Sequence, residues 1–365
     1  TPDNGTATGI GGGFSGIDTI AGGSQADSFT ANAGSLVGAS VTDIDGGGDN
    51  DSVTVDADGS AVVQNITGAA SGDITIAGSS TLTYSSVESR TLDNVPAASW
   101  IGIISASDGA DGTDTFEIVR SGANTVISID GVAAETRLFS EVDSITVDGS
   151  AADDDQLTVD IGGNQVDEVI PAGGIFFNGG VGGTDTLEIT GTISVDTETF
   201  NYTNLNDGSV ELDEDGGGVD GTISYTGLDP LNSPTILPDN VILNYNGGAE
   251  TIAVTDAGGS TTNVNSTLGE NTTFANPSDS LTINAGTGND TINVTSLDLA
   301  ATSSLAINGD AGTDDVNIND ALTLADFDVS SDTIVFNDDV VSASDSTLTA
   351  VDLIDFNGGS LSVAG

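Results

Sequence analysis

The sequence contains no cysteine, histidine, methionine or lysine, and its only cationic side chains are Arg90, Arg120 and Arg137. Without cysteine the chain can form neither disulfides nor a reactive thiolate. Without histidine and cysteine it lacks the usual ligands of a structural zinc site. A Ser-His-Asp triad, a Cys-His pair and a lysine Schiff base are likewise impossible within this chain. These absences lead us to expect a protein that is not an enzyme.

Positive charge is almost absent, because 57 acidic residues stand against 3 basic ones and the formal net charge is −54. A chain of this charge repels phosphate backbones, so we expect no nucleic-acid partner. Divalent cations, by contrast, are attracted. No apolar run approaches membrane-spanning length, so we expect a chain that is not membrane-embedded. The chain starts at Thr1 and has no methionine, so we expect a processed protein or a segment of a longer one.

Aromatic residues are scarce as well, at 4% of the chain, and no amphipathic helix of normal length is evident. Glycine, serine, threonine, aspartate, valine and isoleucine dominate, which is typical of short strands joined by tight turns. The clearest example is residues 281–294, LTINAGTGNDTINV. Apolar residues alternate with polar ones on both sides of its glycine-rich centre, as in strands that bury one face. The segment therefore predicts a strand, a turn and a second strand.

This segment recurs along the chain. The nearest copies cover residues 305–318 and 175–189, and looser ones cover 145–159, 104–118, 44–55 and 243–254. The copies carry an acidic residue at the end of the turn, at Asp51, Asp114, Asp155, Asp185, Glu250, Asp290 and Asp314. Most of the intervals between these acids lie near multiples of about 21 residues, a typical coil length in a β-solenoid. A repeat of this kind predicts a stack of similar coils.

We therefore predict an all-β fold, specifically a right-handed parallel β-solenoid (β-helix) with about 20–24 residues per coil. The alternative is a string of tandem β-sandwich modules in which each copy forms an antiparallel hairpin. The turns of the copies are five to seven residues long, whereas the favoured hairpin loops contain two. This difference in turn length favours the solenoid.

Composition divides the chain into three predicted blocks. Residues 1–95 form an irregular N-terminal cap with the first coils, 96–229 a middle β-repeat block, and 230–365 a C-terminal β-repeat block with RTX-like turns. The third block begins with three closely spaced prolines, Pro230, Pro234 and Pro238. Because proline cannot donate to a strand ladder, we expect this segment to be a linker or an edge crossing.

Two of the turns resemble a known calcium-binding repeat. Residues 285–293, AGTGNDTIN, resemble the G-G-x-G-x-D-x-U-x nonapeptide of RTX (hemolysin-type) proteins, with Ala285 in the first glycine position. Residues 309–317, GDAGTDDVN, are also similar, with Asp310 at the second glycine. In that family the nonapeptides are tandem, so that neighbouring turns share each ion, whereas the copies here lie 24 or more residues apart.

Three other stretches resemble the giant repetitive secreted proteins of planctomycetes and cyanobacteria. They are residues 84–89 (YSSVES), 225–230 (YTGLDP) and 274–284 (FANPSDSLTIN). This resemblance covers most of the chain. It implies an extracellular, β-rich protein of the cell surface.

Calcium is the cofactor that the acidic turns predict, because it takes six to eight oxygen ligands from carboxylates, amides and carbonyls. If residues 284–291 and 308–315 occupy adjacent coils, their side-chain oxygens stack in one corner. The candidate ligands there are Asn284, Asn289, Asp290, Asn308, Asp310, Asp314 and Asp315, and weaker candidates are Asp49, Asp51, Asp111, Asp114 and Asp153–Asp155. The alternative explanation is that Asn, Asp and Gly are the ordinary residues of turns.

Carbohydrate is a second candidate ligand or modification. Aromatic residues that are able to stack on sugars are Trp100, Tyr84, Tyr202, Tyr225 and Tyr245. Most of them lie in strand-like runs, where packing is the competing role. Candidate glycosylation sequons begin at Asn65, Asn201, Asn271 and Asn293. Carboxylate pairs of the glycosidase type arise by chance among 57 acids and identify no active site.

The sequence as a whole predicts an extracellular structural protein. We expect it to form part of a cell-surface fibre, filament or layer by end-to-end or lateral self-association. One alternative is a calcium-dependent adhesin or carbohydrate-binding module with surface glycans as partners. A second is a polysaccharide-degrading β-helix enzyme.

Overall fold

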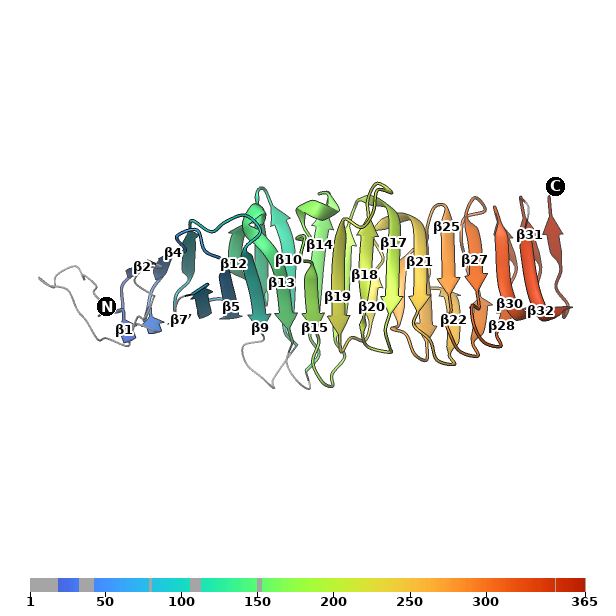
Figure 1. Ribbon diagram of the computed structural model, residues 1–365, viewed down its shortest axis with the longest axis horizontal. Helices are drawn as coiled ribbons and strands as arrows, with labels where there is room; N and C mark the ends of the chain where they lie inside the picture. The colour runs from blue at the N-terminus through green and yellow to red at the C-terminus, as the bar shows by residue number, and fades with distance from the viewer. Residues whose placement is uncertain are drawn as a thin grey trace, which may run out of the picture.

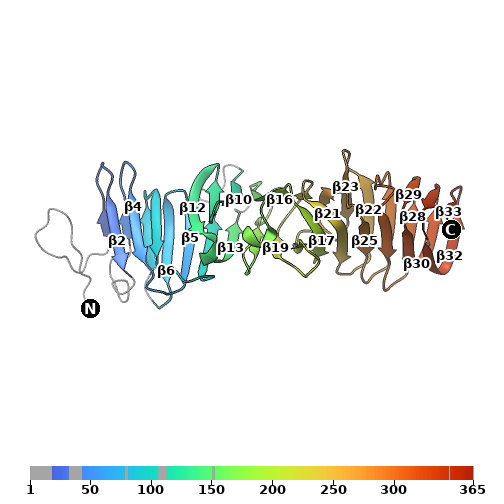
Figure 2. The same cartoon turned by 90° about the horizontal axis from the view of Figure 1, so that it is seen from above.

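The computed structural model describes residues 19–32, 43–78, 81–105, 113–149, 153–344 and 346–364. Over these ranges the chain forms 33 β-strands and two 3-10 helices, η1 (Phe139–Glu141) and η2 (Val166–Glu168). The strands lie across a long rod, and the chain progresses from one end of the rod to the other (Figures 1 and 2). No helix in these ranges has the length and apolar character that crossing a membrane requires. The predicted all-β solenoid is therefore confirmed.

One long face of the rod is a ladder of sixteen strands, which we call the first ladder. In spatial order it contains β1 (Thr19–Ala21), β3 (Asp43–Asp45), β7 (Thr81–Ser85), β6 (Ser71–Ile76), β5 (Val62–Gly68), β9 (Trp100–Ser105), β13 (Val142–Asp148), β15 (Ile175–Asn178), β19 (Gly221–Thr226), β18 (Gly208–Asp213), β17 (Ser194–Tyr202), β21 (Leu237–Tyr245), β25 (Ser280–Asn284), β27 (Ser304–Asn308), β30 (Phe327–Phe336) and β32 (Thr347–Phe356).

A second ladder forms another face. In spatial order it contains β12 (Val132–Leu138), β11 (Asn124–Ile129), β10 (Thr115–Ser121), β14 (Gln156–Gly162), β16 (Thr186–Gly191), β20 (Leu231–Ser233), β24 (Thr272–Ala275), β23 (Thr261–Ser266), β22 (Thr251–Asp256), β26 (Thr291–Thr295) and β28 (Asp315–Ile318). The long strand β30 pairs with both β27 and β28, so the two ladders count as one 27-stranded sheet.

Two short sheets complete the rod near its ends. Each contains three parallel strands from successive coils. One consists of β2 (Ser28–Asn32), β4 (Ser52–Asp56) and β8 (Ser89–Asp93), and the other of β29 (Leu322–Leu324), β31 (Val340–Ser342) and β33 (Leu361–Val363).

The two strands of the 281–294 repeat do not pair with each other. Instead, β25 pairs in parallel with β21 and β27, and β26 pairs in parallel with β22 and β28. The hairpin alternative is therefore wrong for this segment. Its inward residues stack in columns, with Leu281 over Leu305 and Ile283 over Ile307, all essentially without exposure to solvent. Each such side chain contributes roughly 1.5–3 kcal/mol when fully buried.

Coil length varies more than the sequence predicted. Partners in parallel strands are 24 residues apart where Leu281 pairs with Leu305, in agreement with the predicted coil. They are 30 apart where Ile145 pairs with Ile175, and 48 apart where Ile175 pairs with Ile223. The longest coils contain extra strands that run antiparallel to their neighbours.

These extra strands form four antiparallel triplets, two in each ladder of the described chain. The triplets are β5–β6–β7 and β17–β18–β19 in the first ladder, and β10–β11–β12 and β22–β23–β24 in the second. In the triplets β17–β19 and β22–β24, the chain first forms the strand that lies further along the rod. The second strand then runs antiparallel to the first. The third strand runs antiparallel to the second and pairs in parallel with a strand of the preceding coil. Inserting a triplet therefore lengthens a coil without interrupting the ladder.

The two first-ladder triplets share a packing contact. A Cβ atom on Gly72 would lie 2.6 Å from the hydroxyl of Tyr84, and one on Gly208 would lie 2.6 Å from the hydroxyl of Tyr225. The missing side chain in the middle strand thus makes room for the tyrosine of the third strand. Tyr84 and Tyr225 begin two of the motifs that resemble secreted surface proteins, so these motifs coincide with the ends of triplets.

The proline-rich segment was expected to be a linker or an edge crossing, but both of its strands, β20 and β21, are paired on both sides. Strand β20 lies between Pro230 and Pro234 and pairs with β16 on one side and β24 on the other. Pro238 lies within β21, and its carbonyl oxygen accepts a hydrogen bond from the Ser278 N–H at 3.1 Å. The prolines flank the short strand or keep their acceptor, so the ladder tolerates their missing donors.

One break in strand pairing lies between β8 and β12, which share no ladder in the described part of the chain. Arg90 of β8 bridges it. Its guanidinium donates to the carbonyl oxygens of Ala69 at 2.8 Å, Val87 at 2.6 Å and Ala134 of β12. It also forms an ion pair with Glu135 of β12 at 3.5 Å.

Glu135 is the centre of a buried polar cluster at this break. Its carboxylate accepts from Arg137 Nη2 at 2.8 Å and from Gln64 Nε2 at 2.6 Å, in addition to the Arg90 contact. Gln64 Oε1 in turn accepts from Trp100 Nε1 at 3.0 Å. The side chains of all three charged residues are at most 6% exposed. Two of the three cations in the protein therefore surround one buried carboxylate.

Candidate functional site

A series of acidic residues lies at one corner of the rod, just before the strands of the second ladder. Asp155 precedes β14, Asp290 precedes β26 and Asp314 precedes β28. The seven turn acids identified in the sequence are all buried, each at most 4% exposed: Asp51, Asp114, Asp155, Asp185, Glu250, Asp290 and Asp314. We call them, with their hydrogen-bonded neighbours Asp27, Glu88 and Asp332, the acid column.

Hydrogen bonds connect the acid column from coil to coil. The Asp290 N–H donates to Asp314 Oδ1 at 2.9 Å, and the Glu250 N–H donates to Asp290 Oδ1 at 2.9 Å. The same contact links Asp155 to Asp185 at 2.8 Å. Each carboxylate thus accepts the backbone N–H of the equivalent acid in the neighbouring coil. Such charge-assisted hydrogen bonds fix the register between turns that have no ladder of their own.

The column continues in three runs. The Asp314 N–H donates to Asp332 Oδ2 at 2.9 Å, which extends the run from Glu250. The Asp114 N–H donates to Asp155 Oδ1 at 3.2 Å. A separate run near the N-terminal end links Asp27 to Asp51 at 2.6 Å and Asp51 to Glu88 at 2.8 Å.

Glycine at the start of the turn makes room for the carboxylate. A Cβ atom on Gly309 would lie 2.7 Å from Asp314 Oδ2, and one on Gly179 would lie 2.7 Å from Asp185 Oδ2. These distances are shorter than side chains tolerate. The glycine and the acid five or six residues later are therefore coupled by packing, which accounts for their recurrence in the sequence.

Burial raises the pKa values of four acids of the column. Loss of solvent raises the pKa of Asp185 to about 6 and that of Glu250 to about 7, although hydrogen bonds to these carboxylates oppose the shift. The pKa values of Asp290 and Asp314 are also raised by burial, with a further contribution from neighbouring carboxylates. These four acids therefore exchange protons at higher pH than exposed carboxylates do.

The two best calcium candidates lie in adjacent coils, as the sequence prediction required. Asn308 Nδ2 donates to Asn284 Oδ1 at 2.8 Å, which places these two amides in a column on the outer surface of the ladder. Asn289 Oδ1 accepts the Thr313 N–H at 3.0 Å. Asp310 Oδ2 accepts the Gly286 N–H at 3.3 Å. The two turns are thus stacked directly upon each other.

Their oxygens, however, face different environments. Asp290 and Asp314 are buried beneath the turn, whereas Asn289, Asp310 and Asp315 are exposed. One oxygen each of Asp290, Asp314, Asn289 and Asp310 already accepts a backbone N–H, and Asp290 Oδ2 is buried without a partner in the described chain. The arrangement separates the predicted ligands into an inner and an outer set.

The weaker calcium candidates are dispersed. Asp49 is exposed and accepts the Asn50 N–H, and Asp51 and Asp114 belong to the acid column. Asp154 Oδ1 accepts the Thr184 N–H at 2.7 Å. Asp111 lies outside the described residues.

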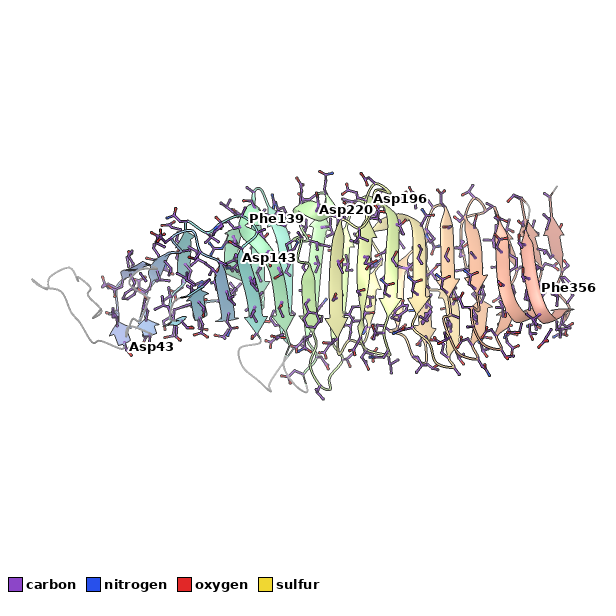
Figure 3. The ribbon with its side chains drawn as sticks, in the orientation of Figure 1. Asp43, Phe139, Asp143, Asp196, Asp220 and Phe356 are labelled. Atoms are coloured by element: carbon purple, nitrogen blue, oxygen red, sulfur yellow. The ribbon has the colours of Figure 1, made fainter. Side chains whose placement is uncertain are left out.

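A different group of carboxylates comes closest to a metal-site arrangement. In the described ranges, Asp213, Asp215 and Asp220 are the only three acids whose ligand oxygens all lie within 4.8 Å of one another. They belong to the loop after β18, where Asp213 also accepts the N–H groups of Gly216 at 2.8 Å and Gly218 at 3.2 Å. Asp220 and nearby Asp196 lie along one long edge of the rod (Figure 3).

Sequence reasoning missed two further buried acids inside the rod. Glu198 of β17 is fully buried; its Oε1 accepts from Ser233 Oγ at 2.6 Å, and its Oε2 has no partner within the described chain. Burial raises the pKa of Glu198 to about 8. Glu270 is 1% exposed, and burial together with the charge of Asp229 raises its pKa to about 8. Both glutamates are therefore protonated at neutral pH.

The aromatic residues proposed for sugar stacking are all buried. Trp100 and Tyr84 are at most 1% exposed, and Tyr202 stacks on Tyr245 inside the rod with ring centroids 4.7 Å apart. The Tyr202 hydroxyl donates to Thr272 Oγ1 at 2.9 Å, and Tyr225 is 1% exposed. These five residues pack the interior, so a role in sugar stacking is wrong for them.

Comparison with known proteins identifies no relative. No protein-family model matches this chain, and no curated protein has a significantly similar sequence.

Proposed function

We propose that this protein is an extracellular structural protein whose rod forms part of a cell-surface fibre, filament or layer. Its role is mechanical rather than catalytic. Stacked apolar columns and the acid column stabilise the rod, and its large negative charge keeps the side faces apart in solution.

The observation that carries this proposal is the exposed last coil at the C-terminal end. Ile354 and Phe356 of β32 continue the buried columns of Ile334 and Phe336, but they are 38% and 50% exposed. The ring of Phe356 stacks on that of Phe336 at 4.9 Å, and it lies at the end of the rod in Figure 3. The inward-facing residues of the last coil are therefore open to solvent.

The same coil has an unpaired strand edge. In the described chain β32 pairs with β30 and with no other strand, and β33 pairs only with β31. An exposed edge with apolar side chains is a template for a further strand. A further coil added here would continue both the backbone ladder and the apolar columns, and we propose that a second rod supplies it.

Multi-angle light scattering over a range of protein concentrations tests the proposal. We expect the mass of the wild-type particles to grow with concentration, and we expect the double variant Ile354→Asp, Phe356→Asp to remain monomeric. Val181→Asp is a matched control, because Val181 is 82% exposed in a turn on the side of the rod. A wild-type chain that remains monomeric at every concentration, with and without added salt and calcium, would contradict the proposal.

A calcium-dependent adhesin is the second candidate function. The stacking of residues 284–291 on 308–315, with Asp290 Oδ2 buried and unpartnered, favours it. This function predicts that the melting temperature rises with added calcium and falls with EDTA. It also predicts that the protein is retained on a glycan or cell surface. A melting temperature that does not respond to either reagent would exclude it.

A further inference from the structure

The first ladder contains an open groove where β15 lies between β13 and β19. The three strands are side by side in the centre of the rod (Figure 1), and β15 begins only at Ile175, after a turn at residues 172–173. The resulting hollow has a volume of about 450 Å³. This volume is within the range of small-ligand sites, roughly 300–1,000 Å³.

Gly174 forms the hollow because it has no side chain. Register pairing places it beside Ser144 of β13 and Thr222 of β19, whose side chains point outward on either side. Gly174 has a φ of +81°, and a Cβ atom there would lie 2.9 Å from the Thr222 carbonyl oxygen. Both its backbone conformation and its packing therefore favour glycine at the floor of the groove.

Phe176 forms one wall of the groove. It lies two residues further along β15, in register with Thr146 of β13 and Ser224 of β19. Its side chain is 36% exposed, whereas the tyrosines and the tryptophan are buried. An exposed phenyl ring beside a hollow offers a flat apolar surface to a ligand.

Four hydroxyl groups line the same groove, from Ser144, Thr146, Thr222 and Ser224. None of the side chains of Ser144, Thr146, Thr222 and Ser224 forms a hydrogen bond within the described chain. Further along the same ladder, the outward positions are occupied by asparagines that bond to one another, as Asn284 does to Asn244 at 2.8 Å. The hydroxyls of the groove thus keep both a donor and an acceptor available.

The groove carries no charge. None of its ten lining residues is acidic or basic, although the protein has 57 acids. The surrounding negative potential repels uronates and sulfated sugars, whereas a neutral ligand meets no such barrier.

We propose that this groove binds a neutral saccharide, with the apolar face of a pyranose ring on Phe176 and its hydroxyls bonded to Ser144, Thr146, Thr222 and Ser224. A pyranose presents one face of C–H groups and a rim of hydroxyls, which matches a phenyl ring bordered by hydroxyl groups. The site is independent of the proposed end-to-end assembly, because it lies on the side of the rod.

Isothermal titration calorimetry with four hexasaccharides tests this proposal. The neutral probes are cellohexaose, laminarihexaose and mannohexaose, and the acidic probe is hexagalacturonate. We expect at least one neutral probe to bind and hexagalacturonate not to bind. EDTA is expected to have no effect on binding, because the groove contains no carboxylate. Failure of all three neutral probes to bind at millimolar concentration would overturn the proposal, as would binding of hexagalacturonate alone.

Two variants identify the groove as the place of binding. Phe176→Ala is expected to weaken binding at least tenfold, and the double variant Ser144→Ala, Ser224→Ala is expected to weaken it about three- to tenfold through lost hydrogen bonds. Leu205→Ala is the control, because Leu205 is 47% exposed in a loop and does not line the groove. Circular dichroism and melting confirm that each variant is folded. Wild-type affinity in folded Phe176→Ala would overturn the proposal.

Discussion

Two buried polar clusters inside the rod neutralise their carboxylates in opposite ways. At the break between β8 and β12, Glu135 is bonded to Arg90 and Arg137, so that its charge is compensated by cations. In the middle of the rod, Glu198 is bonded to Ser233, and within the described part of the chain no cation contacts it. A chain with three cations can compensate few buried acids by ion pairing, and for Glu198 and Glu270 burial favours the neutral, protonated form instead.

The difference predicts that removing the charged group has opposite effects on folding stability in the two clusters. Removing a partner from the ion-paired cluster leaves an uncompensated buried charge, which is strongly unfavourable. Replacing the ionisable Glu198 of the central cluster with a neutral side chain removes the possibility of a buried charge that the fold disfavours. Stability measurements on the same chain therefore separate the two clusters.

The largest effect is expected for Glu135→Leu. This change leaves the buried guanidinium of Arg90 without its carboxylate and that of Arg137 with only Glu141, 3.7 Å away, so the free energy of unfolding should fall by about 3–5 kcal/mol. Urea denaturation followed by circular dichroism measures it. Glu117→Leu, at an exposed position on β10, is the matched control and should change stability far less. Equal losses of stability for the two substitutions would show that the ion pairs of Glu135 do not stabilise the fold.

The second effect is a loss of stability as pH rises. Folding raises the pKa of the buried acids Glu198, Glu250 and Glu270. At a pH between the unfolded and the folded pKa, the acid is therefore protonated in the folded chain and ionised in the unfolded chain. The contribution of this protonation to folding stability is therefore complete below the pKa of the unfolded chain, about 4.5. It is lost as the pH rises toward the folded pKa, which is about 8 for Glu198 and Glu270 and about 7 for Glu250. For fully buried Glu198 the loss is on the order of 4 kcal/mol at most. Melting temperatures at pH 5 and pH 8 measure it, and a higher value at pH 8 would contradict it.

Glu198→Gln sharpens this comparison. The amide oxygen still accepts from Ser233, but the side chain no longer ionises. At pH 5 we expect wild-type stability, and at pH 8 we expect the variant to be about 2–3 kcal/mol more stable than the wild type. Thermal unfolding of both proteins at the two pH values is the measurement. A variant that is destabilised equally at both would indicate an ionised Glu198 with an unseen partner.

The smallest effect concerns the acid column. Asp314→Ala removes the acceptor of the Asp290 N–H, and an unsatisfied buried donor costs about 1–3 kcal/mol. The adjacent Asp315 is exposed, so Asp315→Ala should change stability by no more than about 0.5 kcal/mol. Denaturant unfolding of the two variants compares them. The reverse order of effects would mean that the outer oxygens, rather than the column, stabilise the turn.

Much of the fold was predictable because its repeat is local. The alternation in residues 281–294 identifies two strands, and the repeat length predicts stacking rather than a hairpin. The antiparallel triplets were not predictable in this way, since β22, β23 and β24 show the same alternation as parallel strands. Strand direction depends on partners far along the chain, and no local pattern records it.

The site was predictable only in part. The turn acids were identified correctly as a repeated feature, but an Asp in a glycine-rich turn gives no sign of burial, which depends on an N–H donor in another coil. Glu198 was missed because β17 is irregular: Val195 faces inward, and the next inward residue is Glu198, three positions later rather than two. Strict alternation counted from Val195 therefore places Glu198 on the outer face. Arg90 and Glu135 are 45 residues apart, and their contact exists only through the break between two sheets.

Fibre diffraction from concentrated, oriented protein tests the structural role most directly. Strands lie across the rod, so end-to-end fibres should give a meridional reflection at about 4.8 Å, the spacing between paired strands. Ile354→Asp, Phe356→Asp protein should form no oriented fibres under the same conditions. A wild-type protein that yields only isolated rods, with no fibre and no oriented reflection, would contradict the proposed function.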